Sequence, residues 1–415
     1  MTVEQVVCRC LGLFSCYVET ESRATAFAQA EAGALMSHRV SVFLPSVAGG
    51  GAERAMVNLA RGFARRGLEV DLVLAGAEGP YLSEVDKSVS VIDLHSRRVS
   101  QSLPALVRYL RQRRPRTLVS ALDHANVIAL IACRLIEVSP RTLISVQNTI
   151  SAHLKHIKVK RDRILPLLMR VTYPWADVVG AVSGSVAKEL IGHLHVPAHK
   201  VRVVPNPVVT AELHTKADAP LDEHPWFASN QPPVVLAVGR LTAQKDFGSL
   251  IRAFAIVRRM MPVRLMILGE GEHRQVLEEL VRGRMLTADV ALPGFDPNPY
   301  RYMRRAAVFV LSSLWEGLPT VLIEALAVGT AVVSTNCQSG PAEILEGGKW
   351  GRLVPVGDVQ ALASAIRETL LMDAPYDRKA AQQNMRERYG EDKVAQYYIE
   401  MLSDRSKISQ LSTEM

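Results

Sequence analysis

Short apolar runs recur along most of the chain, and each is followed by a polar or glycine-containing loop and then by a helical pattern. An apolar run bounded by turn residues in this way is typical of a parallel strand buried on both faces of a sheet. Such runs occupy residues 40–44, 70–75, 118–121, 143–146, 177–182 and 201–204, and then residues 234–238, 264–268, 290–292 and 308–311. The alternation predicts an α/β protein built on doubly wound parallel sheets.

The strand pattern is interrupted over residues 214–233, which are rich in proline, aspartate, histidine and alanine. We expect an interdomain linker here. It would separate a domain at 37–213 from a second at 234–390, and 415 residues are enough for two domains of ordinary size. Residues 391–415 contain one more helical pattern and then a tail, while residues 1–36 are an N-terminal extension of unknown role.

Composition narrows the class of protein. Because 48% of the residues are apolar, a folded core is expected and global disorder is excluded. No apolar run reaches the roughly 18–20 residues of a membrane-spanning helix, and residues 6–18 lack the basic start and cleavage site of a signal peptide. The five cysteines, three of them at positions 8, 10 and 16, make no even disulfide framework and suit a reducing cytoplasm.

The net charge of +8 is concentrated in the first half of the chain. Residues 37–213 carry 24 lysines and arginines against 13 acidic residues, which suits an anionic membrane surface or a nucleic acid. Residues 153–175 interleave basic with apolar side chains, so this stretch is either a membrane-docking element or a helix with a basic exterior packed on its own domain. No zinc pattern, RNA-binding aromatic signature or repeat supports a nucleic-acid partner, and we expect none.

Two glutamates and a predicted helix start follow the strand at 308–311. Glu316 lies in the loop, and Glu324 lies inside the helix, with seven residues between them. Pro319 stands where a first helical residue would, so the helix would direct the free N–H of Thr320 into the crevice beyond the strand ends. Open α/β sheets bind ligands in that crevice, and a helix start favours an anion. If the neighbouring residues are ignored, Glu316 is better explained as a charged residue of a loop, and Glu324 as a solvent-exposed residue of a helix.

The flanking residues, EGLPT at 316–320 and IEA at 323–325, resemble the E-x7-E signature of the retaining nucleotide-sugar glycosyltransferases called group 1 or family 4. The resemblance extends from about residue 40 to about residue 355 and implies the GT-B fold, in which two Rossmann-like domains face a central cleft. Residues 37–213 would bind the acceptor and residues 234–390 the donor. The resemblance further implies that Glu316 contacts hydroxyls of the donor sugar, that Glu324 contacts the ribose, and that Leu318, Pro319 and Thr320 lie beside the donor.

Arg240 and Lys245 follow the first strand of the second domain in the sequence GRLTAQK. Two cations beside the same crevice can neutralise a diphosphate leaving group, since arginine offers a fork of donors and lysine a point charge. An arginine and a lysine at this spacing would by themselves be ordinary surface residues. The G-R-L-x-x-x-K pattern, however, resembles the family's pyrophosphate site. The sequence contains no Asp-x-Asp triplet, so we expect no metal and no cofactor, the nucleotide sugar being a substrate.

Four further residues complete the predicted site. Gly50 and Gly51 lie in a glycine-rich loop between a strand and a helix, which by itself is equally well a tight turn. In the resembled family this loop closes over the donor phosphates and the acceptor. His124 follows the strand at 118–121, near the place where the family has a histidine that contacts the donor sugar, and we do not make it a general base. Gly294 would give backbone contacts to the base.

These residues predict a retaining glycosyltransferase that moves a sugar from a nucleotide donor, which we expect to be UDP-linked, to a growing glycan on a lipid carrier. The enzyme would be cytoplasmic and peripheral on the inner face of the cell membrane. A nucleotide-sugar 2-epimerase on the same architecture is the first alternative. A nucleic-acid-binding protein is the alternative from another class.

Overall fold

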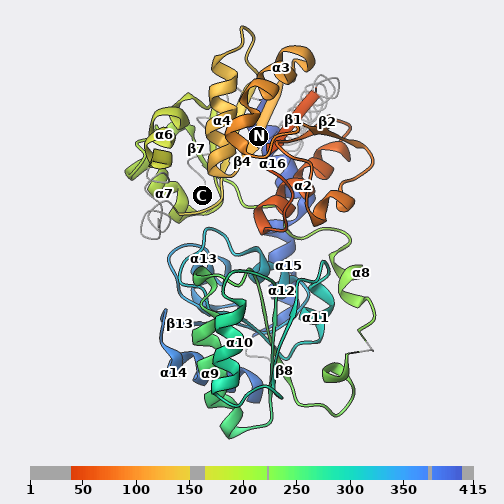
Figure 1. Ribbon diagram of the computed structural model, residues 1–415, viewed down its shortest axis with the longest axis vertical. Helices are drawn as coiled ribbons and strands as arrows, with labels where there is room; N and C mark the ends of the chain where they lie inside the picture. Colours follow the sequence, from red (N-terminus) through yellow and green to blue (C-terminus); the bar gives the residue numbers. More distant parts are fainter. Residues whose placement is uncertain (1–38, 150–163, 222–223, 373–375, 404–415) are drawn as a thin grey trace, which may run out of the picture.

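The computed structural model describes residues 39–149, 164–221, 224–372 and 376–403. They form two α/β domains stacked one on the other, and each is built on one parallel sheet (Figure 1). The predicted fold class, two Rossmann-like domains of the GT-B type, is confirmed. The predictions for residues 1–36 and for the basic stretch 153–163 lie outside the described residues.

The first sheet has seven strands in the order β3-β2-β1-β4-β5-β6-β7. Its strands are β1 (Arg39–Leu44), β2 (Glu69–Leu74), β3 (Val89–Asp93), β4 (Thr117–Ala121), β5 (Arg141–Val146), β6 (Val178–Ala181) and β7 (Val201–Val203). The helices of this domain include α2 (Gly51–Ala64), α3 (Leu103–Arg113), α4 (Asp123–Arg134), α6 (Ile164–Thr172) and α7 (Gly184–Gly192), together with the short 3-10 helix η1 (Pro80–Glu84).

The second sheet has six strands in the order β10-β9-β8-β11-β12-β13. Its strands are β8 (Val234–Val238), β9 (Arg264–Leu268), β10 (Val290–Gly294), β11 (Val308–Leu311), β12 (Val332–Thr335) and β13 (Arg352–Val354). The accompanying helices include α9 (Phe247–Met260), α10 (Arg274–Gly283), α11 (Tyr300–Arg305), α12 (Thr320–Ala327), α13 (Pro341–Ile344), α14 (Val359–Leu371) and α15 (Arg378–Tyr389), and the 3-10 helix η7 (Ala243–Lys245).

Each strand order reverses once, between β1 and β4 in the first sheet and between β8 and β11 in the second. Loops that leave two neighbouring strands in opposite directions open a crevice at the carboxyl ends of those strands. The glycine loop follows β1, and residues 122–124 follow β4, whereas residues 239–245 follow β8 and residues 312–319 follow β11. The predicted site residues therefore lie at the two reversal points.

Every predicted strand is present, with ends shifted by at most two residues, but the pattern missed β3, β12 and β13. β3 is an edge strand whose sequence, VSVID, alternates instead of forming an apolar run, and much of it is exposed. β12 is fully buried, yet it ends in Ser334 and Thr335. The Thr335 hydroxyl donates a hydrogen bond to the Ser313 carbonyl at 2.6 Å. Because this buried polar group has a partner, a polar residue is tolerated in a central strand.

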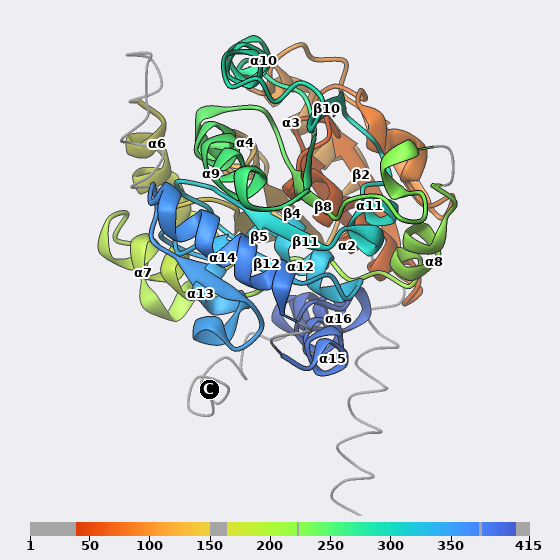
Figure 2. The ribbon, with the colours of Figure 1, turned by 90° about the horizontal axis from the view of Figure 1, so that it is seen from below.

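The chain crosses between the domains twice, and the two crossings are hydrogen-bonded to each other. The N–H groups of Val208 and Val209 both donate to the Tyr389 carbonyl, at 2.9 and 3.0 Å, and the N–H of Glu391 donates to the Val209 carbonyl at 2.9 Å. After the second crossing, α16 (Glu391–Ser403) packs against α2 of the first domain (Figures 1 and 2). The segment 214–233 lies beyond the first crossing and includes most of helix α8 (Leu213–Asp218), which packs on α11.

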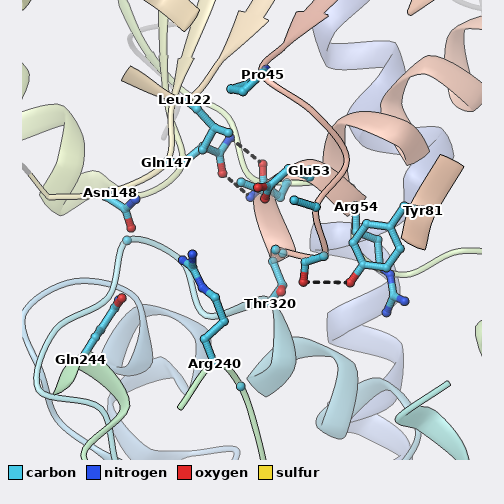
Figure 3. A pocket seen from close by; sticks show the side chains of 18 of the residues that line it. Pro45, Glu53, Arg54, Tyr81, Leu122, Gln147, Asn148, Arg240, Gln244 and Thr320 are labelled. Atoms are coloured by element: carbon cyan, nitrogen blue, oxygen red, sulfur yellow. Dashed lines mark hydrogen bonds between the residues drawn. The ribbon is translucent and has the colours of Figure 1, made fainter. Parts of the chain in front are cut away.

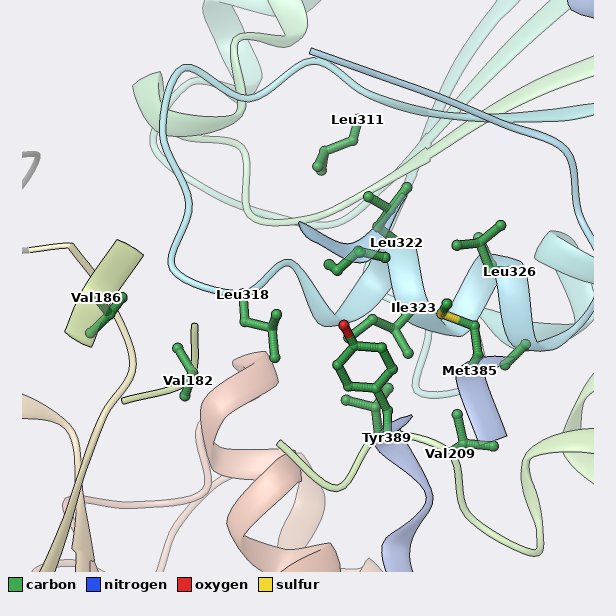
Figure 4. Packing of buried hydrophobic residues seen from close by; sticks show 14 of the residues in the cluster. Val182, Val186, Val209, Leu311, Leu318, Leu322, Ile323, Leu326, Met385 and Tyr389 are labelled. Atoms are coloured by element: carbon green, nitrogen blue, oxygen red, sulfur yellow. The ribbon is translucent and has the colours of Figure 1, made fainter. Parts of the chain in front are cut away.

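One hydrophobic cluster extends from the first domain into the second (Figure 4). It joins Val182 and Val186 of the first domain to Leu318 and Leu322 of the second, and it includes Tyr389 at the end of α15. Apolar surface removed from water contributes about 25 cal/mol per Å². Burial at this junction therefore stabilises the arrangement of the two domains.

Candidate active site

A cleft of about 1120 Å³ lies between the domains, at the carboxyl ends of both sheets (Figure 3). Its walls include residues 48–54, 122–124 and 147–148 of the first domain and residues 239–240, 244–245 and 316–321 of the second, with Glu324. The loops at both reversal points thus line one shared space. Each domain contributes two loops that are far apart in its sequence, and the polar residues of these loops come together in the cleft.

Lys245 and Glu316 form an ion pair in this cleft. The Lys245 Nζ lies 2.6 Å from Glu316 Oε1, and the Ser313 hydroxyl donates to the same oxygen at 2.6 Å. The loops that carry them are held together by Gln244, whose side chain donates to the Trp315 carbonyl at 2.9 Å and whose own carbonyl accepts from Leu314 N–H at 2.8 Å. Lys245 was predicted to bind the diphosphate and Glu316 the sugar, and the two side chains share one partly buried contact.

Arg240 extends from the second domain into the cleft. Figure 3 shows its side chain pointing toward the loop that carries Asn148, beside Thr320. The residue is exposed and lines the cleft. Arg240 and Lys245 thus open into the same space, as their loop at the end of β8 requires.

Helix α12 begins at Thr320, and Pro319 is its N-cap residue with φ −70° and ψ 94°. The prediction that Pro319 is the first helical residue was wrong by one position. A proline ring fixes φ near the helical value but leaves ψ free, and here ψ is extended. Both Pro319 and Thr320 line the cleft, so the start of α12 opens into it as predicted.

The glycine loop of the first domain reaches the start of α12 in the second. A Cβ placed on Gly51 would lie 2.5 Å from the Thr320 hydroxyl oxygen, so only glycine allows this approach without a shift. Gly50 is the N-cap of α2, and the Glu53 carboxylate lies against it where a side chain would be. Both glycines line the cleft, and each leaves room for a neighbouring side chain.

His124 lines the cleft, but it lies in the first turn of α4 and not in the strand-end segment where the sequence placed it. The turn between β4 and α4 is made by Leu122 alone, which has φ +74°. A leucine rarely adopts this backbone conformation, so such a short turn could not be predicted from the residue type. The side chain of His124 is exposed.

Two of the residues predicted to bind the donor have additional or different surroundings in the structure. Leu318 borders the cleft, yet it is 7% exposed and belongs to the interdomain cluster, where Figure 4 shows it near Val182. Gly294 is not part of the cleft wall; its carbonyl accepts from Gly269 N–H at 2.8 Å, and the next residue, Phe295, lines the cleft. Gly294 has φ +101°, a conformation that glycine adopts readily, and this fits a turn at the end of β10.

Sequence reasoning missed the residues that surround Glu324. Arg54 of α2 and Tyr300 of α11 are both buried here, and the Tyr300 hydroxyl lies 3.4 Å from Glu324 Oε1. Burial raises the pKa of Glu324, and Arg54 acts in the opposite direction. Arg54 directly follows the glycine loop, but nothing in the sequence indicates that its side chain reaches the other domain.

Gln147 and Asn206 were also missed as a pair. Their side-chain amides exchange two hydrogen bonds, at 3.1 and 2.7 Å, and both residues are buried at the cleft wall. Asn206 lies in the turn that leads out of the first domain. The pair therefore ties the end of β5 to the exit of that domain.

Metal ligands do not gather in the part of the chain that the structure describes, where no three His, Cys, Asp or Glu residues are grouped to hold an ion. Metal independence stays a prediction. None of the described helices combines the length and the hydrophobicity that are needed to cross a bilayer.

Comparison with known proteins agrees with this geometry. Residues 221–390 match the family Glycosyl transferases group 1, and residues 49–212 match Glycosyltransferase Family 4. The fold is shared with Anabaena HepE in complex with UDP-glucose, at a TM-score of 0.74 and 20% identity over 88% of this chain and 99% of that one. WaaG, a glycosyltransferase involved in lipopolysaccharide biosynthesis, gives a TM-score of 0.66 at 15% identity, over 87% of this chain and 95% of that one. The chain thus has the GT-B fold of these structures, and both of its domains match glycosyltransferase families.

Relatives of similar sequence carry related names. The lipopolysaccharide core biosynthesis glycosyltransferase LpsE of Rhizobium meliloti is 27% identical over 86% of this chain and 94% of its own length. An N-acetylgalactosaminyltransferase of Campylobacter jejuni that acts on a diphospho-undecaprenol substrate is 31% identical over 61% of this chain. The match spans 66% of that protein, and it spans 60% of an uncharacterized glycosyltransferase of Methanocaldococcus jannaschii. Each domain therefore matches a glycosyltransferase family model, and the prediction that the chain is a transferase is confirmed.

Proposed function

We propose that this protein is a retaining glycosyltransferase that moves a sugar from a UDP-sugar to a growing glycan on a lipid carrier. The observation that carries the proposal is the Lys245–Glu316 ion pair in the cleft that the start of α12 lines. It puts a cation for phosphate and an acid for sugar hydroxyls in one place. A single elongated donor can contact both.

Negative charge builds on the diphosphate as the bond from the sugar to the phosphate breaks. Arg240, Lys245 and the free N–H groups at the start of α12 would stabilise that charge, because they are fixed before the reaction and partly shielded from water. Lys245 and Ser313 both contact Oε1 of Glu316, so we assign Oε2 to a hydroxyl of the sugar. Glu324 would accept hydrogen bonds from the ribose. The new bond would form on the face from which the diphosphate leaves, which retains the configuration.

The choice of donor and acceptor has support from the relatives. HepE, which shares the fold, was solved with UDP-glucose, and this favours a UDP-linked donor. The names of LpsE and of the Campylobacter enzyme refer to lipopolysaccharide and to a diphospho-undecaprenol substrate. A lipid-linked glycan is therefore the acceptor class that we propose.

Membrane docking of the first domain is the second part of the proposal. On α6, Ile164, Leu167 and Val171 are each more than half exposed, and their spacing places them on one side of the helix. Apolar side chains of this kind can enter the interface of a bilayer, while the net positive charge of the domain attracts anionic lipid. We propose that α6 lies against the cytoplasmic face of the membrane.

The transfer mechanism is tested by incubating the purified enzyme with a panel of nucleotide sugars and measuring hydrolysis without acceptor. We expect UDP-sugar hydrolysis in the wild type and a loss of at least about 100-fold in Glu316→Ala and in Lys245→Ala, the size typical of a lost transition-state contact. Lys349→Ala is the matched control, because this lysine pairs with Glu346 on the surface. Full activity in both site variants would remove the mechanism. Conversion of the sugar to its 2-epimer would favour the isomerase instead.

Membrane docking is tested by flotation with vesicles of phosphatidylglycerol and phosphatidylcholine at low salt. We expect wild-type protein to float and Leu167→Glu to stay in the dense fraction. Met285→Glu is the control, since Met285 is 90% exposed and belongs to the second domain. A wild type that does not float would make a soluble acceptor the better proposal.

A further inference from the structure

Arg54 belongs to the first domain, but its side chain is buried against the second. Its Nη1 donates to the Tyr300 hydroxyl at 2.9 Å, and its Nη2 donates to the Pro297 carbonyl at 2.9 Å. The guanidinium also lies over the ring of Tyr81, 4.3 Å from its centroid. Arg54 therefore depends on the second domain for two of its hydrogen bonds.

Tyr300 connects this guanidinium to Glu324. The Tyr300 hydroxyl, which accepts from Arg54, donates to Glu324 Oε1 at 3.4 Å. Glu324 is 4% exposed and still borders the cleft. A buried carboxylate of the donor domain is thus joined, through one phenol, to a cation of the acceptor domain.

The charged groups around Glu324 come from several elements. Arg54 faces it from α2 and Tyr300 from α11, while Tyr81 and Glu84 belong to η1. Glu84 lies 3.4 Å from Arg54 Nη2 and is itself paired with Lys216 at 2.7 Å. Arg54 is therefore the cation that acts on Glu324, and Glu84 opposes it.

Arg54 is not simply a good packing residue. Its Nε is buried, and the described part of the chain supplies no acceptor for it. An unsatisfied buried donor costs stability, so packing alone would favour an apolar side chain at this position. The cost in stability is explained if the positive charge of Arg54 has a function.

We propose that Arg54 is a positioning residue for the nucleotide: it keeps the Glu324 carboxylate ionised, and it does so only when the two domains are together. The inference rests on the proposed function, in which Glu324 accepts hydrogen bonds from the ribose. A carboxylate can accept from both ribose hydroxyls, whereas a protonated carboxyl must donate with one oxygen. Recognition of the ribose is thereby coupled to the approach of the acceptor domain.

The effect of pH follows from the sign of the interaction. Burial raises the pKa of Glu324, and the positive charge of Arg54 lowers it, so removal of Arg54 raises that pKa further. The variant Arg54→Met should then bind UDP weakly at low pH and recover as the pH rises and Glu324 ionises. A purely structural defect would weaken binding by the same factor at every pH.

The experiment measures the Kd of UDP by calorimetry at a series of pH values from about 5.5 to 8.5. For Arg54→Met we expect an affinity about tenfold below wild type at the acid end and a smaller deficit at the alkaline end, since one pKa unit corresponds to tenfold. Arg54→Lys, which keeps the charge, should retain the wild-type profile. Arg65→Met is the matched control, because Arg65 lies just beyond the end of the same helix and pairs with Glu212 instead.

Each outcome of the UDP-binding experiment supports or overturns the role of Arg54. An equal loss at all pH values, or a profile for Arg54→Met that matches Arg65→Met, overturns the inference. If Arg54→Met does not fold, Tyr300→Phe removes the hydroxyl that joins the two groups and must show the same acid-side loss, or the inference fails. If wild-type protein binds no UDP at any pH, the proposed function itself is wrong. That result is distinct from failure of the coupling alone.

Discussion

Gly51 and Thr320 meet across the cleft, and each comes from a different domain. An alanine Cβ at position 51 would lie 2.5 Å from the Thr320 hydroxyl oxygen, so the threonine must move at the place where we expect diphosphate to bind. Misplacement of catalytic groups by about 1 Å can cost about 100-fold in rate. Gly51→Ala should therefore lower kcat/KM for the UDP-sugar by about 10-fold to 100-fold.

Stability should change in the opposite direction. Gly51 is the first residue of α2, and alanine stabilises a helical position by up to about 1 kcal/mol relative to glycine. Tm is thus expected to be unchanged or higher while turnover falls. Gly192→Ala is the control, since no heavy atom lies within 4 Å of its added Cβ. A Gly51→Ala enzyme with normal turnover would mean that the loop does not act on the start of α12.

The sequence predicted the positions of some site residues and missed those of others, and the difference has a physical reason. Glu316 and Lys245 lie in the loops that follow β11 and β8, two neighbouring parallel strands whose carboxyl ends share one edge of the sheet, and this explains their proximity. Arg54 could not be found in this way, because Tyr300 and Pro297, which accept its hydrogen bonds, belong to the other domain. Leu318 lines the cleft as predicted, but its place in the interdomain cluster depends on how the two domains pack. The local sequence pattern carries no information on contacts between the domains.

Helix α16 shows how a single element is held on a distant partner. Arg61 of α2 donates from Nε and Nη2 to the two oxygens of Glu391, both at 2.8 Å, and the Glu391 side chain is 3% exposed. Arg61→Met would leave this carboxylate without its bidentate partner. Breaking a buried pair costs about 3–5 kcal/mol, so we expect Tm to fall clearly and α16 to lose protection from hydrogen exchange.

Arg66→Met provides the comparison on the same pair of helices. Arg66 lies 3.3 Å from Asp392, whose side chain is 78% exposed. Exposed pairs contribute roughly 0–1 kcal/mol, so this variant should unfold close to wild type. Equal effects of the two substitutions would show that the Arg61–Glu391 contact does not hold α16 in place.

Whole elements were more predictable than their surroundings. The apolar runs predicted every strand they covered, because a strand buried on both faces needs such a run. The segment 214–233 was expected to be a linker from its proline and polar content, yet most of α8 lies within it and packs on α11. Helix α8 is a short element stabilised by contacts with the rest of the fold, which a local pattern does not reveal.

The two domains touch closely enough that one glycine in the E-x7-E segment limits their approach. A Cβ on Gly317 would overlap the backbone carbonyl of Gln147 in the first domain, and a backbone oxygen cannot rotate away as a flexible side chain can. Gly317→Ala should therefore hold the domains apart while leaving each one folded. We expect a larger radius of gyration in small-angle X-ray scattering, an unchanged far-UV spectrum and a loss of turnover. Gly283→Ala, at a position with no neighbour within 4 Å, should change none of these. Because the cleft needs groups from both domains, an unchanged radius together with normal turnover would mean that the contact at Gly317 is not required for the active arrangement.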